Sequence, residues 1–499
     1  MADGAAVTPI DLPNLTLDSF AGRPVAVLGL ARSGIALARF LHDRGATVTV
    51  YDGQPAEALT DQLAQLGGRP VRLMLGPEVE PSEALAEQAL VCTSPSVSSR
   101  YPTTEPRLRR ALGAVEAEGR VPVVSEVDLF LRLCPAPTVG ITGTKGKTTT
   151  SSLTAAVISA GPARTLLGGN IGTPLVERLP EITTADRVVL ELSELQLPTI
   201  SRGTEIAVYT HVSSDHLDRH GTVEAYRLVK QRLAELLPPD GALVINDEDP
   251  VSRRYGELTV ARAVRYSRST VPADGVGLSD GWIVSTLNGP TTPIMPLAEV
   301  PLPGFHNASN VLAAVAAGLL SGVEEQAIRQ AVADFGGVEH RLEEVAVIDR
   351  VRFVNDSSGT QPDAVISALR AFDPPVVLIA GGRSKDVPLE ELAHEVARRA
   401  AAAVLIGETA EQMEQLFEAA GAARVERAAD LPSAVTRAAD LAREALTDRP
   451  AGEGPTGLAT VLMSPAAASF DMFVDYAARG RAFKQAVLEL QRRSGQVKP

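Results

Sequence analysis

The segment Thr138–Thr149, which reads TVGITGTKGKTT, decides the fold class of this chain. Its apolar start predicts a buried strand, its glycines predict a turn, and the run that begins at Lys147 predicts a helix. Glycines let a backbone wrap so that its N–H groups point at phosphate oxygens, and the positive end of the following helix adds to the attraction. We therefore expect this turn to bind the phosphates of a nucleotide.

Side-chain chemistry assigns roles within this phosphate loop. We expect Lys147 to reach the β- and γ-phosphates of ATP and the Thr148 hydroxyl to bind Mg²⁺. The full motif has a glycine where Ile141 stands, so this loop is a shorter variant; a plain strand–helix turn with an exposed lysine is the alternative. The predicted nucleotide-binding residues of the loop are Gly143, Thr144, Lys145, Gly146, Lys147, Thr148 and Thr149.

Apolar runs alternate with helical patterns on both sides of the loop, which predicts an α/β protein with mainly parallel strands. The pattern of residues 1–124 predicts a Rossmann-like N-terminal domain. Residues 125–336 predict a central P-loop ATPase-like domain, with a small antiparallel insert at 261–303. Residues 337–499 predict a C-terminal Rossmann-like domain that ends in a helix over about 471–492.

Composition limits the function classes. A length of 499 residues suits three domains, and a formal net charge of −14 argues against a general nucleic-acid surface. No apolar run approaches the ~20 residues that span a bilayer. The two cysteines, Cys92 and Cys134, are too few for a disulfide framework and fit a reducing compartment. We expect a cytoplasmic enzyme, monomeric, whose phosphate ligands are held by local donors.

A second glycine turn, GLARSG at 29–34, follows the first predicted strand. A dinucleotide-binding turn would have glycine where Ala31 stands, so a purely structural turn is as consistent with the pattern as a ligand site. If the turn binds a phosphorylated ligand, Ser33 can donate to a phosphate, and Asp52, at the end of the next strand, can accept from a ribose or base.

Polar residues also follow two strands of the central block. Glu191 ends one strand, and His216 follows another. The carboxyl ends of parallel strands meet at one crevice, so both side chains are expected near the Mg²⁺ bound at Thr148. Lys230 lies within a helical pattern, where a solvated lysine is the default interpretation.

These motifs, in this order, resemble the Mur ligase family over roughly residues 22–490. The resemblance is greatest to the members that add glutamate to UDP-N-acetylmuramoyl-L-alanine. The matching stretches are GTKGKTTT (143–150), GGNIG (168–172), LELSELQL (190–197), DHLDRHG (215–221), FHNASN (305–310), EHRLE (339–343), VNDSSGT (354–360), AGGRSK (380–385) and SPAAASFDMFVDYAARG (464–480).

The resemblance implies that ATP phosphorylates the substrate carboxylate and that the incoming amine then attacks the acyl phosphate. It implies catalytic roles for Lys147, Glu191, His216 and Lys230, the last as a carbamylated lysine that supports a second Mg²⁺. It places Asn307, Asn310, Arg341 and Asp356 around the nucleotide. It places Ser33, Asp52, Asn170, Ser193 and Gln196 at the UDP-sugar. It places Thr360, Lys385, Ser469 and Phe470 at the glutamate pocket.

The chain departs from the family pattern at several positions. Lys145 replaces an asparagine of the loop, Ser214 replaces an acidic residue, and Ser358 replaces a lysine beside the amino-acid pocket. The glutamate isomer therefore stays open: D-glutamate is our first choice and L-glutamate the first alternative. A ligase for a folate or cyanophycin-like acceptor and a nucleotide-binding regulator without catalysis are two further hypotheses.

Overall fold

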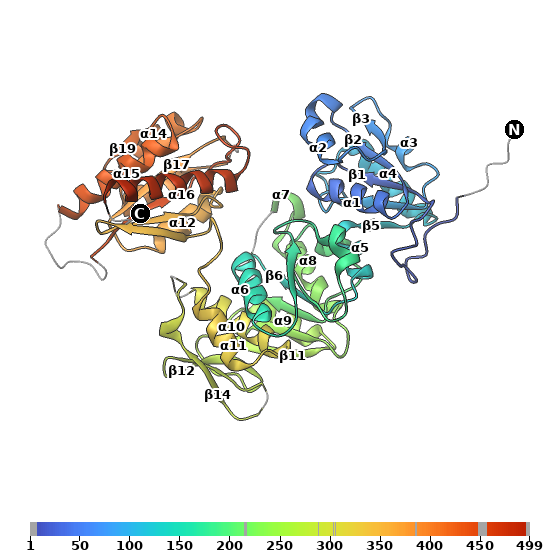
Figure 1. Ribbon diagram of the computed structural model, residues 1–499, viewed down its shortest axis with the longest axis horizontal. Coiled ribbons are helices and arrows are strands. Elements are labelled where there is room, and N and C mark those ends of the chain that lie inside the picture. Colours follow the sequence, from blue (N-terminus) through green and yellow to red (C-terminus); the bar gives the residue numbers. More distant parts are fainter. Residues whose placement is uncertain are drawn as a thin grey trace. The chain divides into compact units, whose positions relative to one another are not determined.

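The computed structural model describes residues 7–213, 217–287, 289–302, 304, 306–384, 387–447 and 457–495. The chain forms two compact units (Figure 1). The first comprises Met1–Pro301 and Phe305–Phe335, and the second comprises Leu302–Gly304 and Gly336–Pro499. Each unit has the α/β architecture expected from the sequence, and among the described helices none is long and apolar enough to cross a membrane.

The first sheet of the first unit is entirely parallel, with strand order β3-β2-β1-β4-β5. Its strands are β1 (Pro24–Leu28), β2 (Thr47–Asp52), β3 (Arg72–Leu75), β4 (Leu90–Thr93) and β5 (Val123–Ser125). Its helices are α1 (Arg32–Asp43), η1 (Ala56–Leu59), α2 (Thr60–Gln65), α3 (Pro81–Leu85), α4 (Pro106–Glu118) and α5 (Glu126–Leu133). The strand order reverses between β1 and β4, and ligands of open parallel sheets bind at such a point.

The second sheet of the first unit has the order β14-β13-β12-β11-β10-β9-β6-β8-β7. Its strands are β6 (Thr138–Thr142), β7 (Thr165–Gly169), β8 (Arg187–Glu191), β9 (Ile206–Tyr209), β10 (Ala242–Asn246), β11 (Arg262–Ser267), β12 (Gly275–Ser279), β13 (Trp282–Ser285) and β14 (Thr292–Pro296). Its helices are α6 (Lys147–Ser159), η2 (Leu175–Glu181), η3 (Leu197–Thr199), α7 (Leu217–His220), α8 (Val223–Glu235), α9 (Pro250–Leu258), η4 (Leu297–Glu299), α10 (His306–Leu320) and α11 (Glu325–Ala333).

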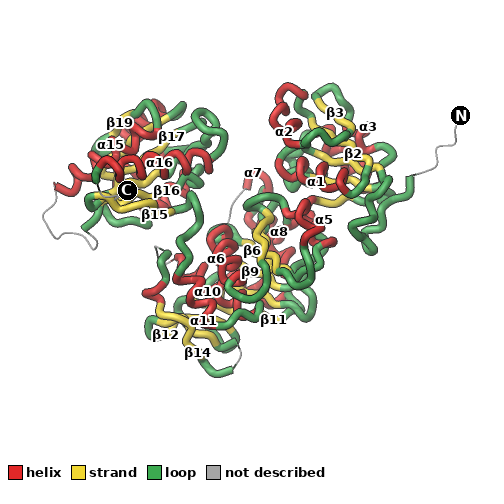
Figure 2. The backbone as a smooth tube through the Cα atoms, viewed as in Figure 1, coloured by secondary structure: helices red, strands yellow, loops and turns green. Residues whose placement is uncertain are grey.

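The predicted antiparallel insert is present as the edge of this second sheet. β12, β13 and β14 pair in antiparallel fashion, as expected. β11 lies within the predicted insert but pairs in parallel with both of its neighbours. The insert therefore extends the parallel sheet and does not form a sheet of its own (Figure 2).

The second unit contains a sheet of order β15-β16-β20-β17-β18-β19, in which only β15 and β16 are antiparallel. Its strands are β15 (Glu343–Ile348), β16 (Val351–Asn355), β17 (Val376–Gly381), β18 (Ala400–Ile406), β19 (Val425–Arg427) and β20 (Ala459–Met463). Its helices are α12 (Pro362–Arg370), α13 (Glu390–Arg399), α14 (Ala410–Ala419), α15 (Leu431–Thr447) and α16 (Tyr476–Arg493). Separate apolar clusters lie on its two faces, one under α12–α14 and one under α15 and α16. The predicted start of the last helix near 471 is wrong, because the Asp475 side chain caps α16 by accepting from the N–H of Ala478 at 2.6 Å.

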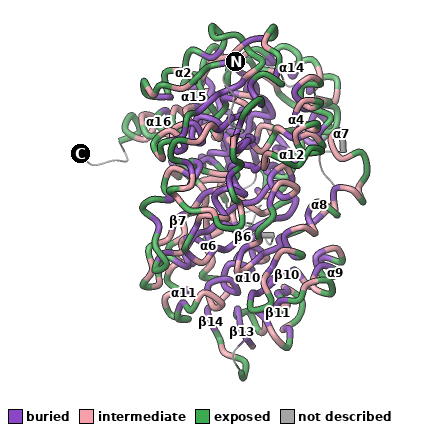
Figure 3. Tube along the Cα trace, turned by 90° about the vertical axis from the view of Figure 1, so that its right-hand side faces the viewer, coloured by how far each residue is buried: buried purple, intermediate pink, exposed green. Residues whose placement is uncertain are grey.

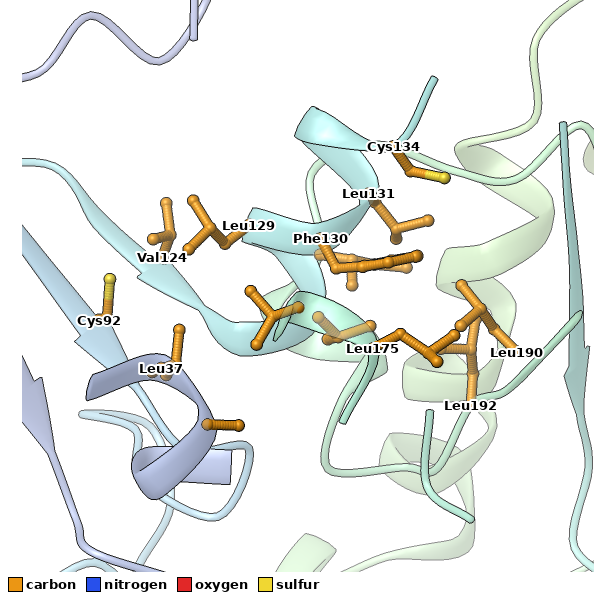
Figure 4. Packing of buried hydrophobic residues seen from close by; sticks show 14 of the residues in the cluster. Leu37, Cys92, Val124, Leu129, Phe130, Leu131, Cys134, Leu175, Leu190 and Leu192 are labelled. Carbon is orange, nitrogen blue, oxygen red and sulfur yellow. The ribbon is translucent and has the colours of Figure 1, made fainter. Parts of the chain in front are cut away.

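One continuous apolar core joins the two sheets of the first unit. Leu37 of α1 and Phe130 of α5 belong to the same cluster as Leu175, Leu190 and Leu192 from the second sheet (Figure 4). Buried residues concentrate in the strands and exposed ones lie on the outer helices and loops (Figure 3). Full burial of one such leucine or phenylalanine contributes about 1.5–3 kcal/mol, so this core, which we call the seam, holds the two sheets together strongly.

A carboxyl group lies buried at the seam. Glu126 begins α5, directly after the N-cap Ser125, and is only 5% exposed. Burial raises the pKa of the Glu126 carboxyl to about 7, although the positive charge of Arg32 and a hydrogen bond with the backbone of Val176 act in the opposite direction. The folded protein therefore binds a proton there that the unfolded chain releases at lower pH.

The substitution Glu126→Gln tests this buried carboxyl. Because the folded pKa is raised, the wild type loses unfolding free energy as pH rises from about 4.5 through about 7. At about pH 8 we expect the free energy of unfolding of the variant to exceed that of the wild type by about 3 kcal/mol. Below about pH 4.5 we expect the two free energies of unfolding to be equal. Urea unfolding followed by Trp282 fluorescence measures this, since Trp282 is the chain's only tryptophan and lies in the first unit. A difference that is the same at both pH values would contradict the assignment.

Candidate active site

The phosphate loop follows β6, which lies between β8 and β9 near the middle of the second sheet. Gly143 has φ = +149°, and a Cβ there would lie 2.0 Å from the Thr210 hydroxyl oxygen. Gly146 has φ = +87°, precedes α6, and leaves room for the Asn310 side chain, whose Oδ1 would lie 2.5 Å from an added Cβ. Both positions therefore require glycine, as the phosphate-loop motif predicts.

The loop is held by the segment that follows β9. The N–H of Thr144 donates to the carbonyl of His211 at 2.6 Å, and the Thr210 hydroxyl donates to the carbonyl of Lys145, also at 2.6 Å. The Thr144 hydroxyl accepts from the N–H of Ser213 at 3.0 Å. The loop backbone is thus fixed without a ligand, which keeps the ordering cost of nucleotide binding low.

The cationic and hydroxyl groups predicted for the phosphates lie at the start of α6. Lys147 is half-buried and its ammonium group donates to the carbonyl of Thr144 at 2.8 Å, across the loop. Thr148 and Thr149 are half-buried in the first turn of the helix, whereas Lys145 is exposed. A positive side chain and the N–H groups of a helix N-terminus lie together here, as an anion site requires.

Glu191 ends β8, the strand beside β6, and is 1% exposed. Its Oε1 accepts from the side-chain amide of Asn170 at 2.8 Å. Its Oε2 is buried and makes no hydrogen bond within the described part of the chain. A buried carboxylate oxygen without a partner is costly and suits a hard cation such as Mg²⁺. His216, the other predicted metal ligand, lies outside the described residues.

Lys230 of α8 is fully buried, so the default interpretation as a solvated lysine is wrong. Its ammonium group donates to the Thr142 hydroxyl at 3.2 Å and lies 5.5 Å from the centre of the Tyr226 ring. The sequence contained this signal, because Tyr226, Lys230 and Leu233 share one face of the helix at spacings of four and three. Lys230 therefore lies beside Thr142, which directly precedes the phosphate loop.

The two asparagines predicted near the nucleotide lie on α10, which packs against α6. Both are buried, and the amide of Asn310 donates to Oδ1 of Asn307 at 2.8 Å. The Thr150 hydroxyl of α6 donates to Oδ1 of Asn310 at 3.2 Å. These residues join the phosphate loop although they are far from it in sequence.

The glycine turn at 29–34 is tightly packed. A Cβ on Gly34 would lie 1.8 Å from the carbonyl oxygen of Gly29. Asp52 holds the turn, since its Oδ2 accepts from the N–H of Leu30 at 2.8 Å and its Oδ1 from the N–H of Gln54 at 2.9 Å. Asp52 therefore has a structural role, and a ligand would share its oxygens. Ser33 is half-buried in the first turn of α1.

Ser94 is a candidate residue that the sequence analysis missed. It follows β4, across the switch point from β1, and its hydroxyl is buried without a hydrogen-bond partner among the residues described. Its oxygen would lie 3.2 Å from a Cβ on Gly29. A polar residue at the end of an apolar strand, in CTSPS, was the available signal.

Ser193 and Gln196 follow β8 and bond to each other. Oε1 of Gln196 accepts from the N–H of Ser193 at 2.9 Å and from its hydroxyl at 3.0 Å. Both residues are buried, and the carbonyl of Leu195 between them accepts from the Tyr101 hydroxyl of the first sheet at 2.8 Å. They therefore form a rigid turn next to the strand end that carries Glu191.

In the second unit, Asp356 follows β16 and is buried. Its Oδ2 accepts from the hydroxyl of Ser464, which follows the neighbouring strand β20, at 2.6 Å, and its Oδ1 accepts from the N–H of Leu342 at 3.2 Å. Burial raises the pKa of Asp356 to about 6, opposed by these bonds and by the charge of the exposed Arg341. This carboxylate therefore fixes the strand ends of the sheet.

The described residues predicted for the amino-acid pocket follow the carboxyl ends of β16 and β20, at the same edge of this sheet. Ser469 is buried, Thr360 is half-buried and Phe470 is 64% exposed; Lys385 lies outside the described residues. The sequence analysis missed Arg479, which is fully buried and donates to the hydroxyl and carbonyl of Ser357 at 3.0 Å each. Arg479 also donates to the carbonyls of Ala467 and Ala468, so it braces the segment that leads to Ser469.

Three family models match consecutive parts of this chain. Residues 23–114 match the Mur ligase MurD-like N-terminal domain, residues 141–318 the Mur ligase middle domain, and residues 340–448 the Mur ligase glutamate ligase domain.

Similar curated proteins carry the name UDP-N-acetylmuramoylalanine--D-glutamate ligase, and two of them serve as examples. The protein from Symbiobacterium thermophilum is 40% identical, over 93% of this chain and 97% of its own length. The protein from Acidobacterium capsulatum is 38% identical, over 94% and 96%.

Solved structures share the fold at low identity. UDP-N-acetylmuramate-alanine ligase MurC from Thermotoga maritima is similar with a TM-score of 0.56 at 16% identity, and the match covers 94% of this chain and all of that chain. MurF from Acinetobacter baumannii is similar with a TM-score of 0.55 at 15% identity, and the match covers 89% of this chain and 91% of that chain.

The substitution Gly143→Ala tests the phosphate loop. The new Cβ would meet the Thr210 hydroxyl in a backbone conformation that costs an L-residue about 1–3 kcal/mol, so we expect affinity for a fluorescent ATP analogue to fall about tenfold or more. Gly113→Ala in α4 is the control, because its nearest neighbour lies 3.8 Å away, and its affinity should equal that of the wild type. Unchanged affinity in Gly143→Ala would refute the loop assignment.

Proposed function

This chain belongs to the Mur ligase family, and we propose that it uses ATP to add D-glutamate to UDP-N-acetylmuramoyl-L-alanine in peptidoglycan precursor synthesis. The observation that carries the proposal is the match, over nearly the whole chain, to relatives named for this reaction. The glycine loop and Glu191 support it, because they follow and end neighbouring strands of one sheet. The precursor is a soluble sugar nucleotide, so we also propose that the enzyme acts in the cytoplasm, as a monomer without nucleic-acid partners.

The reaction begins with transfer of the γ-phosphoryl group of ATP to the carboxylate of the sugar-linked alanine. The N–H groups of the phosphate loop, Lys147 and Thr148 hold the phosphates, and the Asn307–Asn310 pair supports the nucleotide from α10. Oε2 of Glu191, with His216, would hold Mg²⁺, which would supply positive charge to the phosphates. The amine of glutamate then attacks the acyl phosphate and releases inorganic phosphate.

The remaining groups orient the two acceptor substrates. Ser33 lies in α1, which follows β1, and Ser94 follows β4, so they lie on the two sides of the switch point of the first sheet. The sugar nucleotide would bind there, together with Asp52, Asn170, Ser193 and Gln196. Arg341 and Asp356 remain predicted nucleotide-binding residues. Thr360, Lys385, Ser469 and Phe470 would hold glutamate, whose two carboxylates suit hydroxyl donors and a lysine.

We propose that Lys230 is carbamylated. A neutral Nζ attacks the carbon of CO₂, an N–C bond forms and one proton is lost, so a buried cation becomes an anion beside the phosphate loop. The supporting observation is that Lys230 is fully buried, with the Thr142 hydroxyl 3.2 Å from its ammonium group. A buried ammonium is costly, whereas a carbamate there would be a ligand for a second Mg²⁺.

Two competing hypotheses are each supported by departures of the sequence from the family pattern. Lys145 and the serine at position 358 depart from the family pattern, which favours testing L-glutamate as the substrate. Ser214 and Ser358 also motivate a regulator that binds nucleotide without catalysis. The buried, costly Glu191 and Lys230 favour an enzyme, because a protein that only binds nucleotide gains little from them.

Phosphate release from ATP with UDP-N-acetylmuramoyl-L-alanine tests the reaction, with D- and L-glutamate compared in parallel. We expect release with D-glutamate and at least about tenfold less with L-glutamate. A preference for L-glutamate would identify the L-isomer as the substrate. No release with either isomer, while ATP still binds, would identify the chain as a regulator.

The substitution Lys230→Ala tests the carbamate. We expect phosphate release to fall about 10²-fold and to recover in part when a short carboxylate such as acetate is added, because the acid replaces the lost metal ligand. Gln231→Ala, the neighbouring residue, is the control and should retain activity. In the wild type, ¹³C-labelled bicarbonate should give a carbamate resonance. Its absence, together with no recovery by acetate, would contradict the modification.

A further inference from the structure

Asn170 clamps the end of β8. It directly follows β7, its N–H donates to the carbonyl of Glu191 at 2.8 Å, and its side-chain amide donates to Oε1 of Glu191 at 2.8 Å. Gly169 permits this approach, since it has φ = +88° and an added Cβ would lie 2.3 Å from the Glu191 carbonyl oxygen. Two hydrogen bonds therefore fix both the backbone and one carboxylate oxygen of Glu191.

Arg32 reaches Asn170 from the first sheet. It is the first residue of α1 and lies within the glycine turn at 29–34, and its Nη2 donates to the carbonyl of Asn170 at 3.2 Å. The same guanidinium acts on the buried Glu126, whose pKa it lowers against the effect of burial. Within the described residues its remaining N–H groups make no hydrogen bond, so they are available to an anionic ligand at the turn.

The surrounding core makes this connection stiff. Leu190 and Leu192, on either side of Glu191, belong to the seam together with Leu37 of α1 (Figure 4). Well-packed side chains resist small displacements, so the core holds α1 and the end of β8 in fixed positions relative to each other. The geometry thus joins the sugar-nucleotide turn to the metal-binding carboxylate through three residues.

We infer that Arg32 is a positioning residue that couples sugar-nucleotide binding to the divalent cation. It holds the carbonyl of Asn170, whose amide holds Oε1 of Glu191, so that Oε2 stays aimed at the cation. A sugar nucleotide at the glycine turn orders Arg32 and thereby tightens cation binding, and by linkage the cation tightens sugar-nucleotide binding by the same factor. This inference rests on the proposed function for the identity of the sugar nucleotide only.

Binding of Mn²⁺ to the full chain, measured by electron paramagnetic resonance with a non-hydrolysable ATP analogue present, tests the inference. We expect Arg32→Ala to weaken Mn²⁺ binding about tenfold or more, the usual effect of losing a group that orients a ligand. In the wild type, UDP-N-acetylmuramoyl-L-alanine should lower the Kd for Mn²⁺ several-fold, and Arg32→Ala should abolish this change. Asn170→Ala should lower Mn²⁺ affinity by the same factor as Arg32→Ala. The double variant should lose little more Mn²⁺ affinity than either single variant.

Arg39→Ala is the matched control. Arg39 lies on the same helix and crosses the same seam to Glu177 at 2.9 Å, but it does not contact Asn170. It should leave Mn²⁺ affinity unchanged. The inference is overturned if Arg32→Ala binds Mn²⁺ like the wild type, or if Arg39→Ala loses as much affinity. The Mn²⁺ measurement without sugar nucleotide does not depend on turnover. A failure of the ligase assay can therefore be distinguished from a failure of this inference.

Discussion

The parallel pairing of β6 with β8 on one side and β9 on the other determines where the groups of the nucleotide site can lie. Ile141 pairs with Glu191 and with Val208, so all three strands end at the same level of the sheet. The phosphate loop, the carboxylate of Glu191 and the segment at Thr210–Ser213 consequently emerge side by side. A shift of β8 by one residue would turn Glu191 to the opposite face and bring Leu190 or Leu192 to its place.

Several ionisable groups in each of the two units are buried at a cost to stability. Glu191 and Lys230 in the first unit, and Asp356 and Arg479 in the second, are each less than a tenth exposed. Each has hydrogen-bond partners that offset part of the desolvation, yet one oxygen of Glu191 has none within the described residues. Packed cores elsewhere offset this cost, since both units have continuous apolar clusters. Such groups are retained where binding a ligand repays the desolvation.

The sequence predicted the α/β layering, the glycine turn between β6 and α6, and the position of Glu191 at a neighbouring strand end. Alternation of strands and helices, glycine turns and strand-end polar residues are local signals. It did not predict the burial of Lys230, since that depends on which face of α8 meets the sheet. It missed Ser94 and Arg479, whose importance arises from contacts with distant segments, and it placed the start of α16 too early by overlooking the cap at Asp475. It also treated Asp52 only as a ligand acceptor, although two nearby N–H groups already use its oxygens.

The seam between the first two sheets has a consequence for engineering. Its leucines and Phe130 come from both sides of the predicted boundary at 124/125. A protein cut at that boundary would therefore expose an apolar surface to water. Chimeras that exchange the amino-terminal sheet alone between relatives would inherit mismatched side chains on that face. Exchanges that move both sheets together would keep the complementary surfaces of one parent and should yield soluble hybrids more often.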